Sequence, residues 1–295
     1  MSPLRKILLT ALTMAAFAGN SLLCRAALKG TAIDASTFTT VRLVSGAVSL
    51  WVLVRMTRGG RSGAGNWRSA MALFAYAIAF SLAYVHLTTA TGALLLFAAV
   101  QATMISYGLW SGERMWWLQV VGLALAFGGL VGLLLPGLSA PPLLDALLML
   151  GAGVAWGVYS LRGRGAGDPA RVTAGNFVRA ALAAAAMSAV LLAQERASVD
   201  AAGLAYAIVS GALASAMGYI IWYSVLPHLR ATTAATVQLS VPVIAAMGGV
   251  VLLGESITLR LMVASVAILG GIALVVLEKR ATPPERIAAA SASDS

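Results

Sequence analysis

Two apolar stretches of the sequence carry aromatic and hydroxyl side chains at every fourth position. They are Tyr76, Phe80 and Tyr84 in the first stretch, and Ser215, Tyr219 and Tyr223 in the second. Residues four apart lie on one face of a helix, so each set predicts a stripe. Such stripes are suited to lining a cavity that binds a small molecule. The alternative is an aromatic belt at a membrane surface, which explains Tyr84 and Tyr223 better than the other members.

Other side chains that can bind a small polar molecule also interrupt apolar stretches. They are Asn20, Gln101, Trp156, Tyr159 and Gln238. An amide surrounded by hydrocarbon costs several kcal/mol unless it forms a hydrogen bond. Each amide therefore either faces the same cavity or bonds to a neighbouring helix without any part in binding. The candidate substrate-binding residues are these five together with Tyr76, Phe80, Tyr84 and Tyr219.

Residue types that commonly catalyse reactions or bind metals are sparse. His86 and His228 lie far apart and Cys24 is the single cysteine, so neither a metal site nor an intrachain disulfide is expected. The sequence also lacks the Gly-rich loop followed by Lys-Ser or Lys-Thr that holds nucleotide phosphates. The sequence therefore predicts neither an enzyme nor a protein with a cofactor.

The composition places these side chains in a membrane protein. Hydrophobic residues make up 60% of the 295 residues and charged residues 10%, whereas a soluble domain has about 25% charged residues. The mean hydropathy is +0.90. These values exclude a soluble globular enzyme and a disordered chain. The net charge of +10 comes from residues between apolar stretches, so it indicates orientation in a bilayer rather than binding to nucleic acid.

Ten apolar stretches are long enough to span a bilayer, which takes about 17 to 25 residues of helix. They cover residues 7–27, 36–56, 69–86, 88–110, 116–135, 143–161, 173–192, 203–226, 232–252 and 260–277. Ten such stretches in succession cannot all be shielded from water by protein, and they lack the alternation of barrel strands. The sequence therefore predicts an all-α membrane protein with ten transmembrane helices.

Basic residues in the connections predict the orientation of this bundle. If the N-terminus is cytoplasmic, 14 Lys and Arg residues lie in cytoplasmic connections and 4, including Arg25, in outer ones, as the positive-inside rule requires. Both termini are therefore expected in the cytoplasm. A secretory signal, in which Arg5 and Lys6 precede the apolar stretch, is the alternative for the first stretch. Residues 281–295 are rich in Ala, Ser and Pro and are expected to form a disordered cytoplasmic tail.

The two halves of the chain share features in the same order. The matched features are Arg25 with Arg162, Arg42 with Arg179, and Gly112-Glu113 with Gly254-Glu255. They divide the chain into two repeats, residues 1–136 and 137–280, each with five spans. Because five is odd, the second repeat enters the membrane in the opposite orientation, which is typical of secondary transporters. Coincidental similarity between Ala- and Leu-rich helices is the alternative.

These features resemble the EamA-type branch of the drug/metabolite transporter superfamily. The ten spans in two repeats, the Arg early in each second span, and the Gly-Glu turn before each last span carry the resemblance. The aromatic content is most similar to YddG-type amino-acid exporters of bacteria. The resemblance implies that the sixth span lines the cavity, which favours Trp156. Members often carry a proline midway along the fourth and ninth spans, whereas here the ninth has Pro242 and the fourth has Val100.

The predicted function is secondary transport, without ATP, of small metabolites out of a bacterial cell across its inner membrane. Amino acids with aromatic or apolar side chains are the expected substrates, because amides and hydroxyls suit the charged head and rings suit the tail. All ten Asp and Glu residues lie in connections, at helix ends or in the tail. Transport is therefore expected to be facilitative, with His86 as the alternative proton site.

Other functions stay open at this point. They are a carrier for nucleosides or cationic drugs, a membrane-embedded enzyme and a structural membrane protein. The repeat argues against a structural protein, and the sparse catalytic residues argue against an enzyme. The expected partners are the substrate and the lipid bilayer, without nucleic acid, and the protein is expected to be a monomer or a weak homo-oligomer.

The arginines within spans lead to a hypothesis about contacts between the repeats. By the predicted topology, Arg42 and Glu255 lie toward the outer surface, whereas Arg179 and Glu113 lie toward the inner one. A guanidinium buried in a membrane needs a partner. We expect Arg42 to face Glu255 and Arg179 to face Glu113. The alternative is that each Arg extends to the nearer surface or bonds carbonyl groups at a helix end.

Two small-residue motifs predict close helix packing. Gly128 and Gly132 are separated by three residues, as are Gly153 and Gly157. Glycines at this spacing let two membrane helices approach each other closely.

Overall fold

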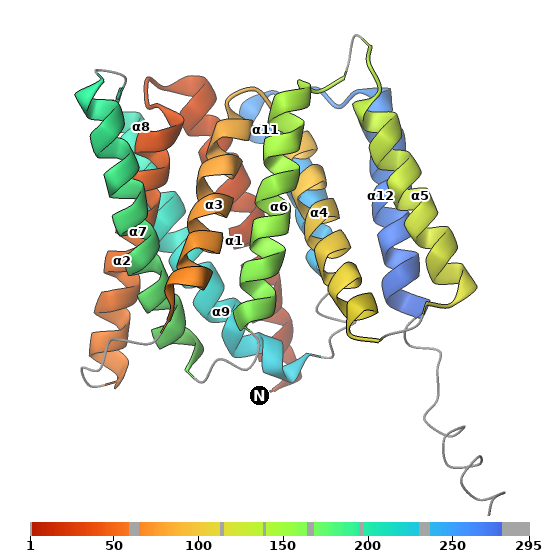
Figure 1. Ribbon diagram of the computed structural model, residues 1–295, viewed down its shortest axis with the longest axis horizontal. Coiled ribbons are helices and arrows are strands. Elements are labelled where there is room, and N and C mark those ends of the chain that lie inside the picture. Colours follow the sequence, from red (N-terminus) through yellow and green to blue (C-terminus); the bar gives the residue numbers. More distant parts are fainter. Residues whose placement is uncertain are drawn as a thin grey trace, which may run out of the picture.

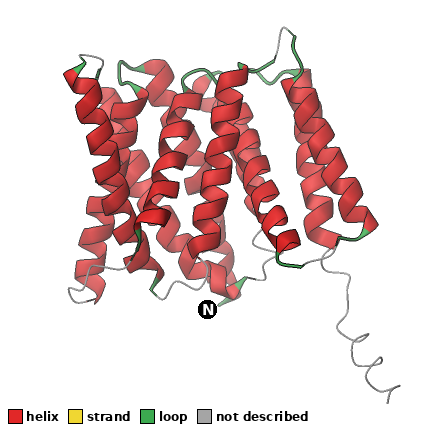
Figure 2. Cartoon of the chain, viewed as in Figure 1, coloured by secondary structure: helices red, strands yellow, loops and turns green. Residues whose placement is uncertain are grey.

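The protein is a bundle of upright helices. A computed structural model describes residues 2–58, 65–112, 115–137, 140–163, 168–194, 197–229 and 237–278. Figure 1 shows the helices standing side by side, and Figure 2 shows that the regular structure in these ranges is helical. The elements are α1 (Pro3–Gly30), α2 (Ala35–Arg58), α3 (Trp67–Tyr84), α4 (Thr89–Trp110), α5 (Trp117–Leu134), α6 (Leu143–Gly163), α7 (Pro169–Ala193), α8 (Ala201–Val209), the π-helix η1 (Ser210–Met217), α9 (Gly218–Val225), the 3₁₀-helix η2 (Leu226–His228), α11 (Ser240–Leu253) and α12 (Leu259–Glu278).

Each predicted span overlaps a helix of the described residues, and α8, η1 and α9 together occupy the eighth. Within the described ranges, eight segments are long and apolar enough to cross a membrane, and α11 is a shorter apolar helix of 14 residues. The prediction of an all-helical protein is therefore confirmed for the described residues, with eight candidate membrane spans among them. Helix α1 extends beyond the predicted stretch 7–27 at both ends. Arg25, which was counted among the outer connections, is buried within this helix and is not a loop residue.

Local sequence signals explain where several helices begin and end. Asn66 caps the start of α3 and Thr88 caps the start of α4, each through a side-chain oxygen that accepts a backbone N–H. At the other end, Gly254 closes α11 with a φ of 62°, and Gly112 follows α4 with a φ of 92°. Glycine suits these left-handed positions because it lacks a Cβ atom. The glycine of each predicted Gly-Glu motif thus follows the end of a helix.

The helices pack in an order that leaves α1, α3, α4 and α6 in the middle of the bundle. The pair α5 and α12 forms one end and the pair α2 and α7 forms the other (Figure 1). A Cβ atom on Gly153 would lie 2.5 Å from the Leu96 carbonyl oxygen of α4, so this glycine permits the close approach of α6. The prediction of close helix packing at Gly128 and Gly132 is wrong, because a Cβ atom on either would meet nothing within 4 Å among the described residues.

The eighth span is interrupted by the π-helix η1. A Cβ atom on Gly211 would lie 2.1 Å from the carbonyl oxygen of Arg42 and from Oγ of Ser45 on α2. Only glycine fits such an approach. Wide π-turns are rare and occur often at functional sites, and here η1 turns Ser210 and Ser215 toward the middle of the bundle, where both are buried.

The fourth and ninth spans differ at their matched positions, Val100 and Pro242. Pro242 is the third residue of α11 rather than a residue midway along a described helix. Proline is tolerated in a first turn because the missing N–H has no partner there. The fourth span is a continuous helix through Val100. Residues 281–295 and Glu113 lie outside the described residues.

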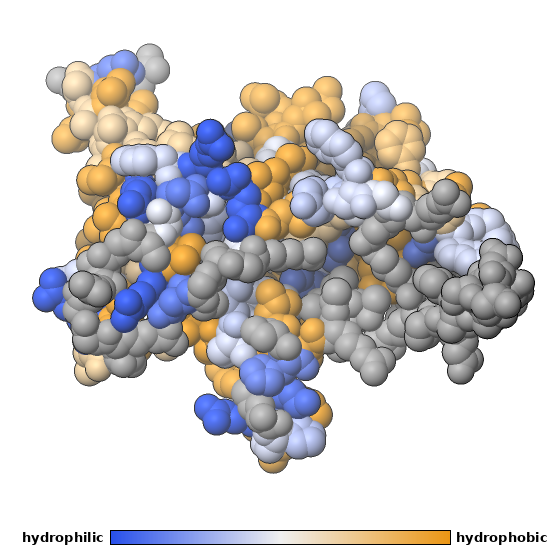
Figure 3. All heavy atoms as spheres, turned by 60° about the horizontal axis from the view of Figure 1, so that its bottom comes forward, coloured by the Kyte–Doolittle hydropathy of each residue, from blue (hydrophilic) through white to orange (hydrophobic). Residues whose placement is uncertain are grey.

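The exterior is that of a protein in a lipid environment. Large apolar side chains are exposed along the sides of the bundle. Trp67, Trp110, Trp116 and Trp117 are exposed near helix ends on the face where the chain begins, which we call the N-terminal face. Figure 3 turns this face forward and shows hydrophilic residues gathered on it. Aromatic rings at such a boundary are typical of the membrane interface. We call the opposite face the far face.

Candidate substrate site

An aromatic cluster occupies the centre of the bundle around Trp156 of α6. The Trp156 ring centroid lies 5.0 Å from that of Tyr76 and 4.8 Å from that of Tyr219. It also lies 5.6 Å from Tyr159 and 6.3 Å from Phe17. The rings are tilted or edge to face, which their quadrupoles favour. Because they come from α1, α3, α6 and α9, the cluster forms only where these four helices meet.

A cavity of about 20 Å³ lies among these rings. Its walls are Phe17, Asn20, Ser21, Tyr76, Phe80, Leu96, Phe97, Trp156, Ala214 and Tyr219. A volume of this size has room for about one water molecule. A larger molecule can enter only if the walls move apart, so the cavity is in a closed form.

Most of the predicted binding residues meet at this cavity. Those that line it are Asn20, Tyr76, Phe80, Trp156 and Tyr219. Tyr84 and Tyr159 lie directly behind the wall, since the Tyr84 ring packs edge to face on Phe80 at 4.7 Å and Tyr159 packs on Trp156. The interpretation of Tyr84 as a membrane-surface residue is wrong, because this side chain is completely buried.

The two predicted glutamines do not line the cavity. Gln101 and Gln238 are both buried, and Nε2 of Gln101 has no hydrogen-bond partner among the described residues. Helix α4 presents Leu96 and Phe97 to the cavity instead. Gln101 lies one helical turn closer to the N-terminal face, beyond the reach of the cavity wall.

Several residues of the site were not predicted from the sequence. In the cavity wall they are Phe17, Ser21, Leu96, Phe97 and Ala214. Phe17 and Ser21 line the cavity beside Asn20, and the spacing of three residues from Asn20 could have indicated Phe17. Ser210 of η1 donates from Oγ to Oδ1 of Asn20 over 2.6 Å. Asn20 in turn donates from Nδ2 to the Tyr76 hydroxyl over 3.3 Å. The Asn20 amide is therefore held in place from two helices.

Arg42 lies at the centre of the bundle next to the cavity wall. It donates from Nε to Oγ of Ser215 over 3.1 Å and from Nη2 to the Tyr76 hydroxyl over 3.1 Å. Its guanidinium carbon lies 5.0 Å from the Phe80 ring centroid. The predicted contact between Arg42 and Glu255 is wrong, because the Arg42 side chain extends toward α3 and η1 rather than toward the far face.

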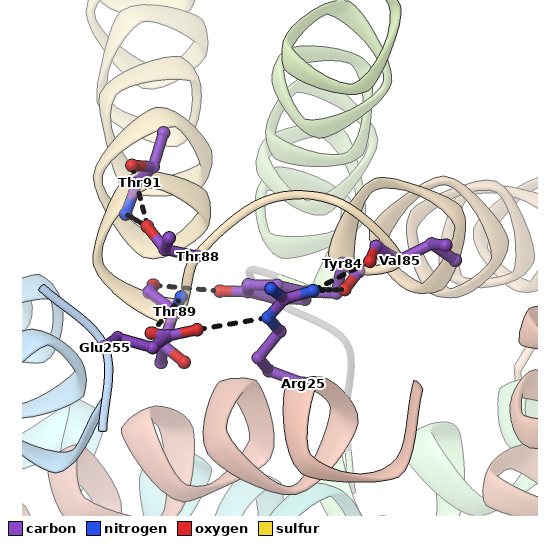
Figure 4. Close-up of polar contacts among 7 residues, drawn as sticks. All are labelled: Arg25, Tyr84, Val85, Thr88, Thr89, Thr91 and Glu255. Carbon is purple, nitrogen blue, oxygen red and sulfur yellow. Dashed lines mark hydrogen bonds and ion pairs between the residues drawn. The ribbon is translucent and has the colours of Figure 1, made fainter. Parts of the chain in front are cut away.

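The partner of Glu255 is Arg25. Nε of Arg25 lies 3.1 Å from Oε1 of Glu255, and its Nη1 donates to the carbonyl oxygens of Tyr84 and Val85 over 3.0 Å and 2.7 Å. Oε2 of Glu255 accepts the backbone N–H of Thr89 over 2.8 Å. Figure 4 shows these contacts joining α1, the turn between α3 and α4, and the end of α11. Both charged side chains are buried.

This ion pair lies between the cavity and the far face. Arg25 follows the cavity residue Ser21 by four positions on α1, and Tyr84 follows Phe80 by four positions on α3, so each lies about 6 Å further along its helix. The pair and the Tyr84 ring therefore form a layer over the cavity on that side.

A second hollow of about 30 Å³ lies toward the N-terminal face. Its walls are Asn66, Ser69, Tyr159, Arg162, Gly163, Val172, Thr173, Asn176 and Tyr223. Arg162 donates from Nε to Oγ of Ser69 over 3.0 Å and from Nη2 to Oδ1 of Asn66 over 3.2 Å. Tyr159 borders this hollow and also packs on Trp156, so its ring lies between the two spaces.

Arg179 and His86 lie away from the cavity. Arg179 donates from Nη1 to the carbonyl oxygen of Gly175 on its own helix over 2.9 Å, which agrees with the alternative of a bond to helix carbonyls. Its expected partner Glu113 lies outside the described residues. His86 is exposed near the far face, with Nδ1 lying 3.1 Å from Oδ2 of Asp145.

Known proteins are similar to this chain in sequence and in fold. A family profile described as the EamA-like transporter family matches residues 143–277. A relative from Pseudomonas aeruginosa, named "Uncharacterized protein PA1977", is 59% identical over 272 residues, which cover 92% of this chain and 94% of the relative. A solved structure, described as the crystal structure of a protein, shares the fold with a TM-score of 0.64 at 19% identity, over 92% of this chain and 98% of its own. The chain therefore belongs to the EamA-like transporter family of membrane transporters.

Proposed function

We propose that this protein is a secondary transporter that exports small metabolites, foremost amino acids, across the inner membrane of a bacterium by alternating access. The observation that carries this proposal is the closed aromatic cavity among α1, α3, α4, α6, η1 and α9. Binding sites of secondary transporters lie near the middle of the membrane between two repeats. The cavity lies within one chain, which is compatible with a monomer or a weak homo-oligomer.

The packing of the helices supports two inverted repeats, residues 1–136 and 137–280. The second helices of the two halves, α2 and α7, pack on each other, as do the fifth helices, α5 and α12. Such self-pairing is expected of elements that lie on a twofold axis between repeats. The basic connections on the N-terminal face support a cytoplasmic position for that face.

Alternating access requires a barrier on each side of the site in turn. On the far face, the pair of Arg25 and Glu255 connects α1, α4 and α11 above the cavity. Toward the N-terminal face, the cavity is separated by Tyr159 from a hollow lined with hydroxyl and amide groups. We propose that the substrate enters from the cytoplasm through this hollow and leaves once the far-face pair separates.

The chemistry of the walls supports amino acids as substrates. Asn20, Ser21 and Tyr76 offer an amide and two hydroxyl groups for a polar head, while Trp156 and Phe80 offer ring surface for an apolar side chain. The sequence has no Asp or Glu in the middle of a span, which supports facilitative transport without a bound proton.

Uptake into liposomes that contain the purified protein tests this function. A panel of radiolabelled amino acids is offered, with protein-free liposomes as the control. We expect accumulation up to, and not beyond, the outside concentration, fastest for amino acids with apolar or aromatic side chains. If every amino acid fails while a nucleoside or a cationic drug is transported, the substrate class is wrong.

A further inference from the structure

The charge of Arg42 is left incompletely compensated. Arg42 is 1% exposed, and a guanidinium stays protonated inside proteins. Its described contacts are the hydroxyl groups of Ser215 and Tyr76 and the faces of the Tyr76 and Phe80 rings. Nη1 has no hydrogen-bond partner among the described residues. A buried donor without a partner costs about 1 to 3 kcal/mol, and a charged one costs more.

Arg25, the other buried arginine of α1 and α2, has a charged partner and a fuller set of hydrogen bonds. Arg25 is paired with Glu255 and donates to two backbone carbonyl groups. Its charge is neutralised and its role is to connect helices. The contacts of Arg42 are neutral, so a purely structural role does not account for a charge at this depth.

The Arg42 guanidinium lies behind two rings of the cavity wall. The Tyr76 hydroxyl bonds Arg42, and the Tyr76 ring lines the cavity together with Phe80, whose centroid is 5.0 Å from the guanidinium carbon. These two rings form the part of the wall between Arg42 and the cavity. The cavity must widen to accept any molecule larger than water, and displacement of these rings would open it toward the guanidinium.

The remaining contacts of Arg42 hold the guanidinium in place for a ligand. Ser215 belongs to η1, which Gly211 brings against the Arg42 backbone. A guanidinium presents two parallel N–H groups to a carboxylate, and such charge-assisted bonds are about twice as strong as neutral ones. The described wall contains no acidic group that could bind an ammonium ion in the same way.

We propose that Arg42 binds the carboxylate of the transported molecule while the aromatic cavity holds its apolar tail. This inference rests on the proposed transport function and narrows it to small monocarboxylates with an apolar or aromatic tail. The α-ammonium group of an amino acid is tolerated but not required. Cationic compounds without a carboxylate are excluded, because they meet a fixed positive charge.

Three ligands with the same phenyl tail test this inference. They are phenylalanine, 3-phenylpropionate, which lacks the ammonium group, and phenethylamine, which lacks the carboxylate. Binding to the purified protein is measured by titration calorimetry, and phenylalanine transport is measured in liposomes. We expect phenylalanine and 3-phenylpropionate to bind with affinities within about tenfold of each other, and phenethylamine to bind at least about 10-fold more weakly than either.

The variant Arg42→Gln is expected to lose about 10- to 100-fold in affinity for both carboxylates and to bind phenethylamine no worse than before. Arg55→Gln is the matched control, since Arg55 lies on the same helix but is exposed over Trp51. Its affinities are expected to stay unchanged. If Arg42→Gln does not fold, the ligand series on the unaltered protein still decides the matter.

The outcomes separate this inference from the proposed function. Equal binding of phenethylamine and 3-phenylpropionate, or unchanged carboxylate binding by Arg42→Gln, overturns the role of Arg42 even if phenylalanine is transported. Carboxylate binding that depends on Arg42, without transport of any amino acid, overturns the amino-acid function and supports the inference. If none of the three ligands binds, the inference is overturned, while the proposed function is still decided by uptake of the amino-acid panel.

Discussion

Trp156 is the side chain on which most of the aromatic cluster depends. Four other rings pack on it, contributed by three other helices and by its own. Its nearly complete burial means that the indole contributes wall area rather than a membrane anchor. The size of the substrate tail should therefore determine how much contact is lost when the indole is removed.

Trp156→Ala is expected to slow transport of large apolar or aromatic substrates more than transport of small ones. The lost contact grows with the area of the substrate, at roughly 25 cal/mol per Å² of apolar surface. The measurement is the initial uptake rate for alanine and for phenylalanine at equal protein level. Trp117→Ala is the control, because Trp117 is exposed. An equal loss for both substrates contradicts a role in the cavity wall.

Arg25 and Glu255 provide a second prediction at the scale of single residues. Removal of one partner from a buried ion pair leaves an uncompensated charge, which costs about 3 to 5 kcal/mol. Arg25→Gln and Glu255→Gln are therefore each expected to lower the thermal stability in detergent, while the double variant loses less than the sum of the two.

The control is a second set of single and double variants, in which Arg42→Gln replaces Arg25→Gln, measured by the same loss of thermal stability. Arg42 has no contact with Glu255 among the described residues, so its loss of stability is expected to add to that of Glu255→Gln. Additive losses for Arg25 and Glu255 would contradict the ion pair in the membrane-embedded protein.

At the scale of elements, η1 determines how closely the eighth span packs on α2. The approach depends on Gly211, where a Cβ atom would lie 2.1 Å from the Arg42 carbonyl oxygen. Gly211→Ala is expected to destabilise the protein by about 1 to 3 kcal/mol, the usual cost of overpacking, and to reduce transport by moving Ser215 away from Arg42. Thermal unfolding in detergent and uptake rates measure the two effects.

Gly128→Ala is the matched control for Gly211→Ala. Gly128 also lies within an apolar helix, but a Cβ atom there meets nothing within 4 Å. This substitution is expected to be neutral or slightly stabilising, because alanine favours helix more than glycine does. Similar losses for both variants would contradict a specific contact between η1 and α2.

The connection between α1 and α2 links the two halves of the chain through Asp34. Its carboxylate accepts hydrogen bonds from Ser36, Thr37 and the backbone N–H of Ser198, which precedes α8. Burial acts to raise the pKa of the Asp34 carboxyl, but these hydrogen bonds outweigh it and hold the pKa below its ordinary value. The carboxylate therefore stabilises the fold.

Asp34→Ala is expected to lower the stability at pH 7 by about 1 kcal/mol, the typical cost of losing a helix cap. Since the folded-state pKa is depressed, the contribution of Asp34 is complete above the unfolded pKa of about 4 and is lost as the pH falls through the folded-state pKa. The difference in unfolding temperature between the two proteins should therefore shrink below pH 4. A difference that stays constant with pH contradicts the role of the charge.

At the scale of the whole molecule, the acidic groups in the part of the chain that the structure describes lie toward the ends of the helices. Glu255 and Asp145 are buried, but Glu255 is bound to Arg25 in the connection after α11, and Asp145 lies in the first turn of α6 beside His86. Transport in liposomes is therefore expected to have the same initial rate with and without an imposed proton gradient.

The measurement compares amino-acid uptake with a pH gradient and after its collapse by a protonophore. Accumulation against a concentration gradient, driven by the pH gradient alone, would contradict facilitative transport. His86→Ala would then be the first variant to examine, because His86 is the titratable group next to buried Asp145.

The sequence by itself determined the class of fold and much of the site. Apolar length and the absence of strand alternation are properties of continuous segments, so each helix could be located without its neighbours. Tyr76 and Phe80 are four positions apart, which placed both on one helix face, and both line the cavity. The Gly-Glu motif likewise indicated a helix end at Gly254, because a left-handed residue is a local requirement.

Only the tertiary structure decided which of these groups meet. The topology predicted from the sequence put both Arg25 and Arg42 toward the outer surface of the membrane. That Arg25 is the partner of Glu255 depends on the rotation and approach of three helices. The π-helix that brings Ser215 to Arg42 has no comparable periodic signal. Contacts across helices depend on distances of a few ångström between segments far apart in the chain, and a single sequence carries no record of those distances.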